Sequence, residues 1–400
     1  MQQISLKGKA LVAYSGGLDS HVLLHLASQT SDLNIRAIHI HHGLQKIADT
    51  WVEHCQSVCD KLNIPLQIVY LKLRPSKGES IEGSAREARY QAFRQALHPD
   101  EILLTAQHQN DQSETILLQL FRGAGVQGLA AMPEIRDFGK GKHARPLLGV
   151  SRRELEHYAH QYQLNYIEDP SNQDLSFDRN YLRQQILPQL RQRWAGLDKA
   201  LNRSASIQAE TRQLLDEIAA EDLSCICDPQ NNTVKIDKLL DFSAIRQKML
   251  LRYWIAQSGF KYPSEKKLQH LFSDVIHARE DAQPLLEWQQ TQIRRYNKRL
   301  YIMPELTAHD PRQSFVWDTT KPLKIASLQL ELSPEILHTR KQTVTVRFRQ
   351  GGEKIYCPKK NKMIPLKKLF AEKGIPPWLR SRLPLICADG QIIQIAGLTL

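Results

Sequence analysis

The sequence predicts an α/β fold with a parallel sheet for the N-terminal domain, then a helical middle domain and a small α+β C-terminal domain. Up to about residue 150, short β-prone runs alternate with amphipathic stretches, a pattern typical of parallel sheets. Helical periodicity follows, and beyond Trp288 come short alternating runs punctuated by Gly and Pro. Single cores stop growing at roughly 250 to 300 residues. For 400 residues we therefore expect domains at 1–200, 201–305 and 306–400.

The first domain should contain four strands separated by helices. The expected strands are ALVAY (10–14), IRAIHI (35–40), LQIVYLKL (66–73) and EILLTAQH (101–108). The expected helices are 20–28, 46–62, 83–97 and 111–121. Ser84 with Glu87, Asp111 with Glu114, and Ser151 with Glu154 have the spacing of N-terminal capping boxes. The main polar motifs follow strands, where open α/β sheets bind their ligands.

The chain carries a formal net charge of +12, and most of the excess lies near its C-terminal end. Residues 311–400 hold 16 Lys and Arg against 6 Asp and Glu, which indicates a polyanionic partner such as nucleic acid or, alternatively, a solubility surface. The basic residues around Trp378 that suit an RNA backbone are Lys359, Lys360, Lys362, Lys367, Lys368, Arg380 and Arg382. A second polar set that could position RNA comprises Asp169, Asn172, Arg179, Asn180 and Arg183.

No apolar run reaches the roughly 18 residues of a membrane span, and no signal-peptide pattern opens the chain, so we expect a cytoplasmic protein without a membrane partner. The six cysteines lack zinc-ligand spacing and should be reduced thiols. The sequence leaves the oligomeric state open, with a homodimer as one option.

The stretch AYSGGLDS (13–20) lies at the first strand-to-helix junction and matches neither G-x-G-x-x-G nor G-x-x-x-x-G-K-[ST]. A glycine pair lets backbone N–H groups approach an anion at a helix N-terminus, so the loop suits a phosphate chain. A carboxylate in a phosphate cradle repels its ligand unless a cation such as Mg²⁺ lies between them, which makes Asp19 a metal candidate. The expected nucleotide-binding residues are Ser15, Gly16, Gly17, Leu18, Asp19 and Ser20.

SGGLDS resembles the pyrophosphate loop, or PP-loop, of the N-type ATP pyrophosphatases. The resemblance implies an adenine nucleotide alpha hydrolase-like fold and cleavage of ATP between its α and β phosphates. Four further stretches narrow the family: HIHHGL (39–44), SAREARY (84–90), LLTAQHQNDQSET (103–115) and FRGAGVQGLAAM (121–132). Together with ARPLL and IEDPSNQDLSFDRNYLR they closely resemble the tRNA(Ile)-lysidine synthases over about the first 190 residues.

This resemblance implies a ligase that acts on the wobble cytidine of tRNA(Ile) with a CAU anticodon. ATP, with Mg²⁺, adenylates the 2-oxo group of that cytosine, and free L-lysine then displaces AMP to give lysidine. The product pairs with adenosine, so the tRNA changes from methionine to isoleucine specificity.

Three groups of side chains beyond the loop are candidates for this chemistry. Arg86 suits phosphates or the cytosine oxygen, because guanidinium stays charged and binds such oxygens bidentately. Asp111 and Glu114 stand at a helix start and could hold Mg²⁺, with Asp111 as the metal ligand, or hold the lysine ammonium, or act only as caps. His41 follows a strand, where a nucleotide contact and a structural role are equally open.

One motif departs from the family pattern AHHxDDQxET. This chain has Gln107 in place of the first His and Asn110 in place of the first Asp. Neither side chain can titrate near neutral pH, so any catalytic role that requires a proton or a charge at these positions is in doubt.

Two other functions remain open at this point. A sulfur-transferring tRNA enzyme of the same superfamily would need cysteines beside the nucleotide, and the motif loops contain none. A non-catalytic module that senses ATP while binding RNA would need the loop, but not Asp19, Arg86, Asp111 and Glu114 together.

Overall fold

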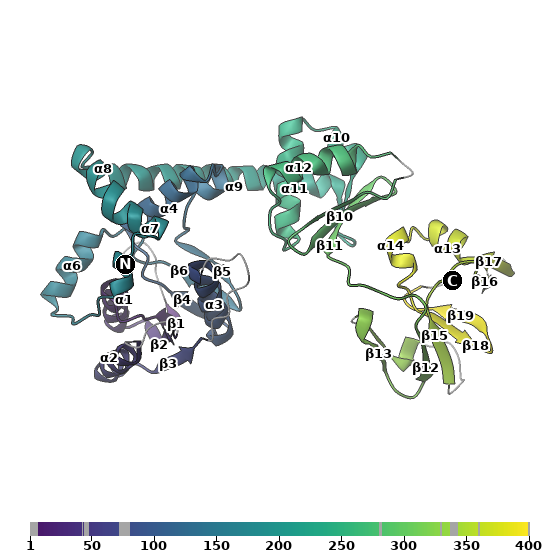
Figure 1. The fold of residues 1–400 in the computed structure, drawn as a ribbon, viewed down its shortest axis with the longest axis horizontal. Coiled ribbons are helices and arrows are strands. Elements are labelled where there is room, and N and C mark those ends of the chain that lie inside the picture. Colours follow the sequence, from purple (N-terminus) through teal and green to yellow (C-terminus); the bar gives the residue numbers. More distant parts are fainter. Residues whose placement is uncertain are drawn as a thin grey trace. The chain divides into compact units, whose positions relative to one another are not determined.

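The computed structural model describes residues 7–41, 43, 48–71, 81–279, 282–328, 330–336, 343–358 and 361–398. The chain forms two compact units, Met1–Leu215 and Asp216–Leu400, which we describe separately (Figure 1). The three-domain division at 1–200, 201–305 and 306–400 stays a prediction. In the part of the chain that the structure describes, no helix has the length and hydropathy needed to cross a bilayer.

The first unit is built on a six-stranded sheet with strand order β3-β2-β1-β4-β6-β5. All neighbouring pairs are parallel except β5 with β6. The strands are β1 (Gly8–Ala13), β2 (Leu33–His41), β3 (Leu66–Tyr70), β4 (Glu101–Leu104), β5 (Ile135–Phe138) and β6 (Gly141–Ala144). The α/β class with a parallel sheet, as the sequence predicted, is confirmed.

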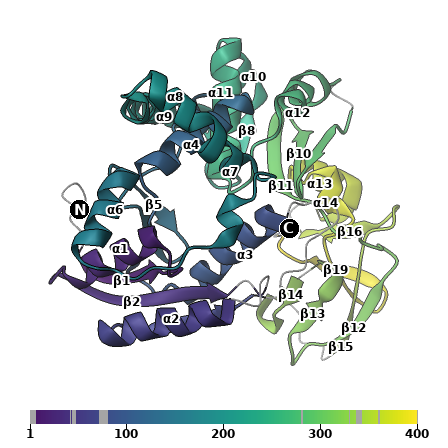
Figure 2. The same ribbon diagram turned by 60° about the vertical axis from the view of Figure 1, so that its left-hand side comes forward.

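Helices cover both faces of this sheet. Alternate residues of β1 separate the two layers, because Ala10 and Val12 pack against α1, α2 and α6 while Leu11 packs against α3 (Figure 1, Figure 2). The helices of the unit are α1 (Leu18–Ser28), α2 (Ala48–Lys61), α3 (Ile81–Ala96), α4 (Gln109–Phe121), α5 (Val126–Leu129), α6 (Arg152–Gln161), α7 (Asp178–Tyr181), a π-helical turn (Leu182–Ile186), α8 (Leu187–Arg193) and the start of α9 (Leu197–Ile226). A 3₁₀ turn spans Pro170–Gln173.

The sheet topology places a ligand site beside β1. From β1 the chain moves outward through β2 and β3, and then returns to β4 on the other side of β1. Such a reversal of strand order opens a crevice at the carboxyl ends of the two central strands. The segments after β1 and β4, which carry SGGLDS and AQHQND, come together here, with Nε2 of His108 3.7 Å from Oδ2 of Asp19.

Several element boundaries differ from the sequence prediction. The fourth strand ends at Leu104 rather than at His108, and α1 begins at Leu18 rather than at Ser20. The predicted capping pair at Ser84 is wrong, because α3 already begins at Ile81 and Ser84 lies inside it. The pair Ser151 and Glu154 is confirmed as the capping box of α6. Residues 46–47 and 72–73 lie outside the described ranges.

The second unit begins with helices packed on a five-stranded sheet of order β7-β8-β11-β10-β9. The sequence predicted these helices and the alternating runs of 291–303, which form two strands of the sheet, but not its other three strands. The sheet buries Val234, Ile293 and Leu300 against the helices. The strands are β7 (Cys227–Asp228), β8 (Thr233–Lys235), β9 (Leu285–Trp288), β10 (Thr291–Tyr296) and β11 (Arg299–Pro304). The helices are α10 (Ile236–Leu240), α11 (Ala244–Gln257), α12 (Glu265–His270) and a π-helical turn (Leu271–Ile276).

The C-terminal part of this unit is an α+β structure, as predicted. Its main sheet has the order β12-β15-β18-β19, and two further hairpins accompany it. The strands are β12 (Ser314–Asp318), β13 (Leu323–Ile325), β14 (Leu330–Leu332), β15 (Thr343–Arg347), β16 (Lys354–Cys357), β17 (Lys362–Pro365), β18 (Leu385–Ala388) and β19 (Gln391–Ile395). Helices α13 (Leu366–Glu372) and α14 (Pro377–Arg380) complete it, with 3₁₀ turns at Ala326–Leu328 and Pro334–Ile336.

Candidate functional site

The loop between β1 and α1 has the form of an anion cradle. Gly16 has φ +86°, and Gly17 is the N-cap of α1 without a side-chain capping bond. The Ser15 and Ser20 hydroxyls lie 3.0 Å apart, and the Ser20 hydroxyl donates to the carbonyl of Gly17 over 2.9 Å. The first N–H groups of a helix have no acceptor within it and attract negative charge. The loop can therefore bind phosphate oxygens through backbone donors.

Gly16 is required for packing as well as for conformation. A Cβ at this position would lie 2.7 Å from Cδ1 of Ile167, closer than real Cβ contacts allow. The backbone N–H of Ile167 also donates to the carbonyl of Gly16 over 2.9 Å. The segment around Ile167 thus packs against the loop at Gly16 and is hydrogen-bonded to it.

Asp19 lies in the first turn of α1, directly after the loop, and faces two basic side chains. Its Oδ1 accepts a hydrogen bond of 2.7 Å from Nη1 of Arg152, and its Oδ2 lies 3.7 Å from Nε2 of His108. Burial raises the pKa of Asp19, although His108 and Arg152 oppose the shift. Arg152 lies 133 positions further along the chain, too far for any local pattern to link it to Asp19.

His108 connects the two acids that were predicted as metal ligands. It is the N-cap of α4, where its ring Nδ1 accepts from the backbone N–H of Asn110. The backbone N–H of His108 donates to Oδ2 of Asp111 over 3.0 Å. Its Nε2 lies 3.5 Å from the same Oδ2 and 3.7 Å from Oδ2 of Asp19. The capping box of α4 is therefore His108 with Asp111, and the predicted box of Asp111 with Glu114 is wrong.

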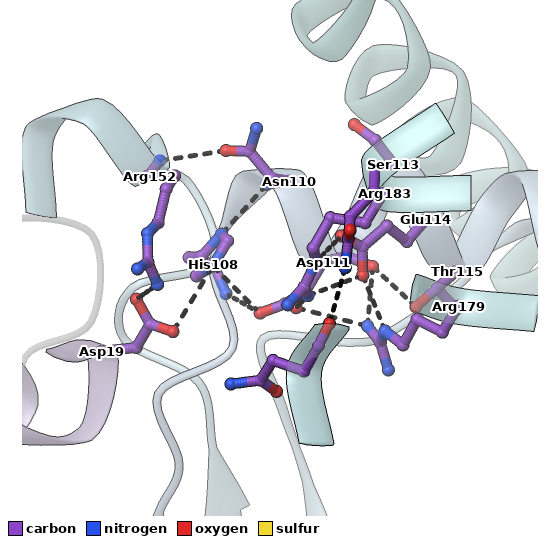
Figure 3. A network of polar contacts seen from close by, with 12 residues as sticks. Asp19, His108, Asn110, Asp111, Ser113, Glu114, Thr115, Arg152, Arg179 and Arg183 are labelled. Carbon is purple, nitrogen blue, oxygen red and sulfur yellow. Dashed lines mark hydrogen bonds and ion pairs between the residues drawn. The ribbon is translucent and has the colours of Figure 1, made fainter. Parts of the chain in front are cut away.

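Asp111 and Glu114 form a compact cluster with Arg179 of α7 and Arg183 of the π-helical turn that follows α7 (Figure 3). Glu114 is 1% exposed, and its two oxygens accept from Nε of Arg179 and Nε of Arg183, each over 2.6 Å. Asp111 Oδ1 lies 3.4 Å from Arg179 and 3.0 Å from Arg183. Burial would raise the pKa of Asp111, but His108 and the two arginines hold it below its usual range.

The two departures from the family motif have definite contacts. Asn110 accepts a 2.9 Å hydrogen bond at its Oδ1 from the backbone N–H of Arg152, which begins α6. Gln107 accepts at its Oε1 from the hydroxyl of Thr105. Both side chains act through hydrogen bonds and need no charge.

Arg86 and His41 lie outside the acidic cluster. The exposed Arg86 of α3 stacks its guanidinium 5.6 Å from the ring centre of Tyr90. His41 ends β2, with its Nε2 3.3 Å from Oδ1 of Asp49 and its ring 5.0 Å from that of Tyr70. Arg179 and Arg183 of the polar set that could position RNA form ion pairs with Glu114, and their contact with RNA stays a prediction. Lys359 and Lys360 lie outside the described residues.

The donor set fits Mg²⁺ held jointly with phosphate. No cluster of three or more His, Cys, Asp and Glu suited to a metal occurs among the residues described. The carboxylates of Asp19 and Asp111, however, both approach one atom, Nε2 of His108, at 3.7 and 3.5 Å. One or two carboxylates completed by phosphate and water oxygens are what Mg²⁺ uses in nucleotide sites.

Comparisons with known proteins agree with this arrangement. A family model described as a PP-loop domain matches residues 2–190. The models described as the TilS substrate binding domain and the TilS substrate C-terminal domain match residues 235–301 and 344–400.

Three full-length relatives carry the same name. The tRNA(Ile)-lysidine synthase of Serratia proteamaculans is 45% identical over 99% of this chain and 92% of its own length. That of Coxiella burnetii is 42% identical over 96% and 88%, and that of Pectobacterium atrosepticum 43% identical over 98% and 90%. The chain therefore belongs to the tRNA(Ile)-lysidine synthase family.

Proposed function

We propose that this protein is a ligase that couples L-lysine to the wobble cytidine of tRNA(Ile) with a CAU anticodon, using ATP. The 2-oxo oxygen of cytosine bonds to the α-phosphorus of ATP, and pyrophosphate leaves. The side-chain amine of lysine then attacks C2, the ring carbon that carries this oxygen. AMP departs with the oxygen, and the amine loses a proton. The observation that carries the proposal is the convergence of SGGLDS and two carboxylates at the reversal of strand order.

The residues of this chain have separate tasks in the proposed reaction. The N-terminus of α1 and the hydroxyls of Ser15 and Ser20 bind the phosphates. Asp19 and Asp111 would hold Mg²⁺, which when bound neutralises phosphate charge next to them. Arg86 supplies a guanidinium to a phosphate or to the 2-oxo group.

Arg152 and Glu114 position these groups. Arg152 fixes the carboxylate of Asp19, and Glu114 fixes the two arginines that face Asp111. Because both oxygens of Glu114 are bound to arginine, a positioning role suits this residue better than contact with the substrate.

Sulfur transfer is not supported by the thiols. Cys55 and Cys59, the pair nearest the loop, are buried in α2. Burial raises the pKa of each thiol to about 12, so neither is a thiolate nucleophile near neutral pH.

The decisive test is mass spectrometry of nucleosides after incubation of the tRNA with ATP, Mg²⁺ and isotope-labelled lysine. We expect labelled lysidine together with equal amounts of AMP and pyrophosphate. Asp19→Ala should abolish all three products while tRNA binding persists. Asp32→Ala, which removes an exposed carboxylate that contacts Lys7 at 3.8 Å and the hydroxyl of Ser31 at 3.5 Å, is the matched control. Intact ATP with the unmodified protein would refute the proposal.

A further inference from the structure

A chain of polar side chains leads from the interior of the first unit to Gln107. Nη2 of Arg145 lies 3.3 Å from Nδ1 of His143, and Nε2 of His143 lies 2.7 Å from the hydroxyl of Thr105. That hydroxyl donates to Oε1 of Gln107. His143, Arg145 and Thr105 are 0%, 3% and 5% exposed, so water does not compete for these bonds. We call Arg145, His143 and Thr105 the relay.

The chemistry of Arg145 sets the direction of every bond in the relay. A guanidinium has only donors, so Nδ1 of His143 must accept and the proton of the neutral ring must lie on Nε2. His143 then donates to the oxygen of Thr105, whose single proton is left for Gln107. The opposite direction would place an N–H of His143 against an N–H of Arg145.

Two further features keep the hydrogen bonds of the relay in this direction and keep His143 neutral. Nη1 of Arg145 donates to the carbonyl of Pro133 over 2.6 Å, and its guanidinium also bonds the side chain of Tyr90. Burial, assisted by the charge of Arg145, lowers the pKa of His143 to about 3. His143 is therefore neutral at any pH at which the enzyme would work.

The relay gives Gln107 a defined orientation. Its carboxamide oxygen is engaged by Thr105, and no partner for its Nε2 occurs among the residues that the structure describes. Gln107 is half-buried and lies in the loop after β4, next in sequence to His108, whose Nε2 approaches Asp19 and Asp111. It therefore presents its two N–H donors, with its oxygen already turned toward Thr105, at the position where the family pattern AHHxDDQxET has a histidine. Arg86, stacked on Tyr90, lies next to the same relay.

We propose that Gln107 is a specificity-determining residue that reads the target base through its carboxamide N–H. The inference rests on the proposed function, since that function supplies a pyrimidine at this site. Cytosine offers two acceptors side by side, its 2-oxo oxygen and its ring nitrogen at position 3, whereas uracil carries a proton on that nitrogen. The carboxamide N–H of Gln107 can therefore donate to N3 of cytosine, whereas in uracil it would face the N3–H group, which is itself a donor.

The test compares anticodon stem-loops that carry cytidine or uridine at the wobble position. Binding is measured by fluorescence anisotropy without ATP, and lysidine formation is followed separately on full tRNA. Gln107→Glu replaces the donor by a carboxylate, which should reduce the cytidine preference in binding by about 10- to 100-fold, the usual range for losing one base contact. Thr105→Val frees the carboxamide to rotate, which should weaken the preference and raise KM for tRNA more than it lowers kcat. Gln109→Glu adds the same charge two residues away and should leave the preference unchanged.

The possible outcomes separate the inference from the proposed function. If the unmodified protein forms lysidine but Gln107→Glu keeps its full preference for cytidine, the inference is wrong and the function stands. If no lysidine forms, yet the preference for cytidine exists and depends on Gln107, the function is wrong and the inference stands. If binding shows no preference for cytidine, the inference fails whatever the activity. Circular dichroism of each variant checks that a lost preference does not reflect unfolding.

Discussion

Glu114 illustrates how one buried side chain can organise a polar site. Its carboxylate is almost fully shielded and yet meets two guanidinium groups, so the charges compensate each other away from water. Removing one partner of such a group leaves a buried charge uncompensated, which costs about 3 to 5 kcal/mol. The site is therefore held by ion pairs whose loss would disturb stability and geometry together.

Gly16 gives a residue-scale prediction with an internal control. Gly16→Ala places a methyl group 2.7 Å from Ile167 at φ +86°, whereas Gly123→Ala has φ +67° and no atom within 4 Å. Both variants should lose roughly 1 to 2 kcal/mol from the left-handed backbone conformation. Gly16→Ala should lose more, because Ile167 must also move, and its affinity for ATP should fall. Thermal unfolding and ATP binding check this, and equal losses in the two variants would contradict it.

At the scale of elements, α4 shows what the sequence can and cannot predict. The D-x-x-E spacing correctly indicated a helix start near Asp111, but it assigned the cap to Asp111 because a histidine rarely takes that position. The arginines that bind Asp111 lie 68 and 72 positions away in the chain. Spacing rules report contacts within one element, so such pairs emerge only once the topology is known.

The ion pair between β2 and β4 provides an element-scale prediction. Glu101 is 3% exposed and accepts from Nε and Nη2 of Arg36 over 2.7 and 2.6 Å. Burial alone would raise the pKa of Glu101, but the bonds from Arg36 and from the N–H of His98 lower it overall. This contribution to stability is fully present above the pKa of an unfolded glutamate, about 4.3. It is lost as the pH falls through the lower pKa of the folded state.

Glu101→Gln should therefore reduce the free energy of unfolding by about 3 kcal/mol at pH 7. The difference from the unmodified protein should shrink as the pH falls below the pKa of an unfolded glutamate, about 4.3, and should be lost below the lower pKa of the folded state, where both states bind the proton. Urea unfolding at several pH values measures this. Glu87→Gln breaks only an exposed 3.7 Å pair with Arg94, and its effect should stay within about 0.5 kcal/mol. A difference for Glu101→Gln that does not depend on pH would exclude the ion pair as its cause.

At the scale of the whole molecule, alternation of strand and helix patterns was enough to predict the four parallel strands β1 to β4 of the first unit. It did not predict β5 and β6, which form a hairpin of four-residue strands with no helix between them. It indicated alternating runs at β10 and β11 but did not join them to a sheet of the middle region, because β8, which pairs with β11, is separated from it by α10, α11 and α12. Short strands such as Thr233–Lys235 also carry too few residues for a recognisable alternation. The local sequence pattern was thus enough to predict a sheet only where each strand is followed in the chain by its own helix.

The basic C-terminal region gives a prediction about the partner of the whole molecule. Lys362, Lys367 and Lys368 are exposed. If they contact RNA phosphates, replacing all three by Ala should weaken tRNA binding and flatten its salt dependence. Each lost contact should reduce the slope of log affinity against log salt concentration by about 0.7 to 0.9. The matched control replaces Lys7, Lys9 and Lys140, which lie at the amino ends of β1 and β6, opposite the strand ends that carry the site. Both triple variants lower the net charge equally, so equal slopes would assign the effect to overall charge and contradict a specific RNA contact in the C-terminal region.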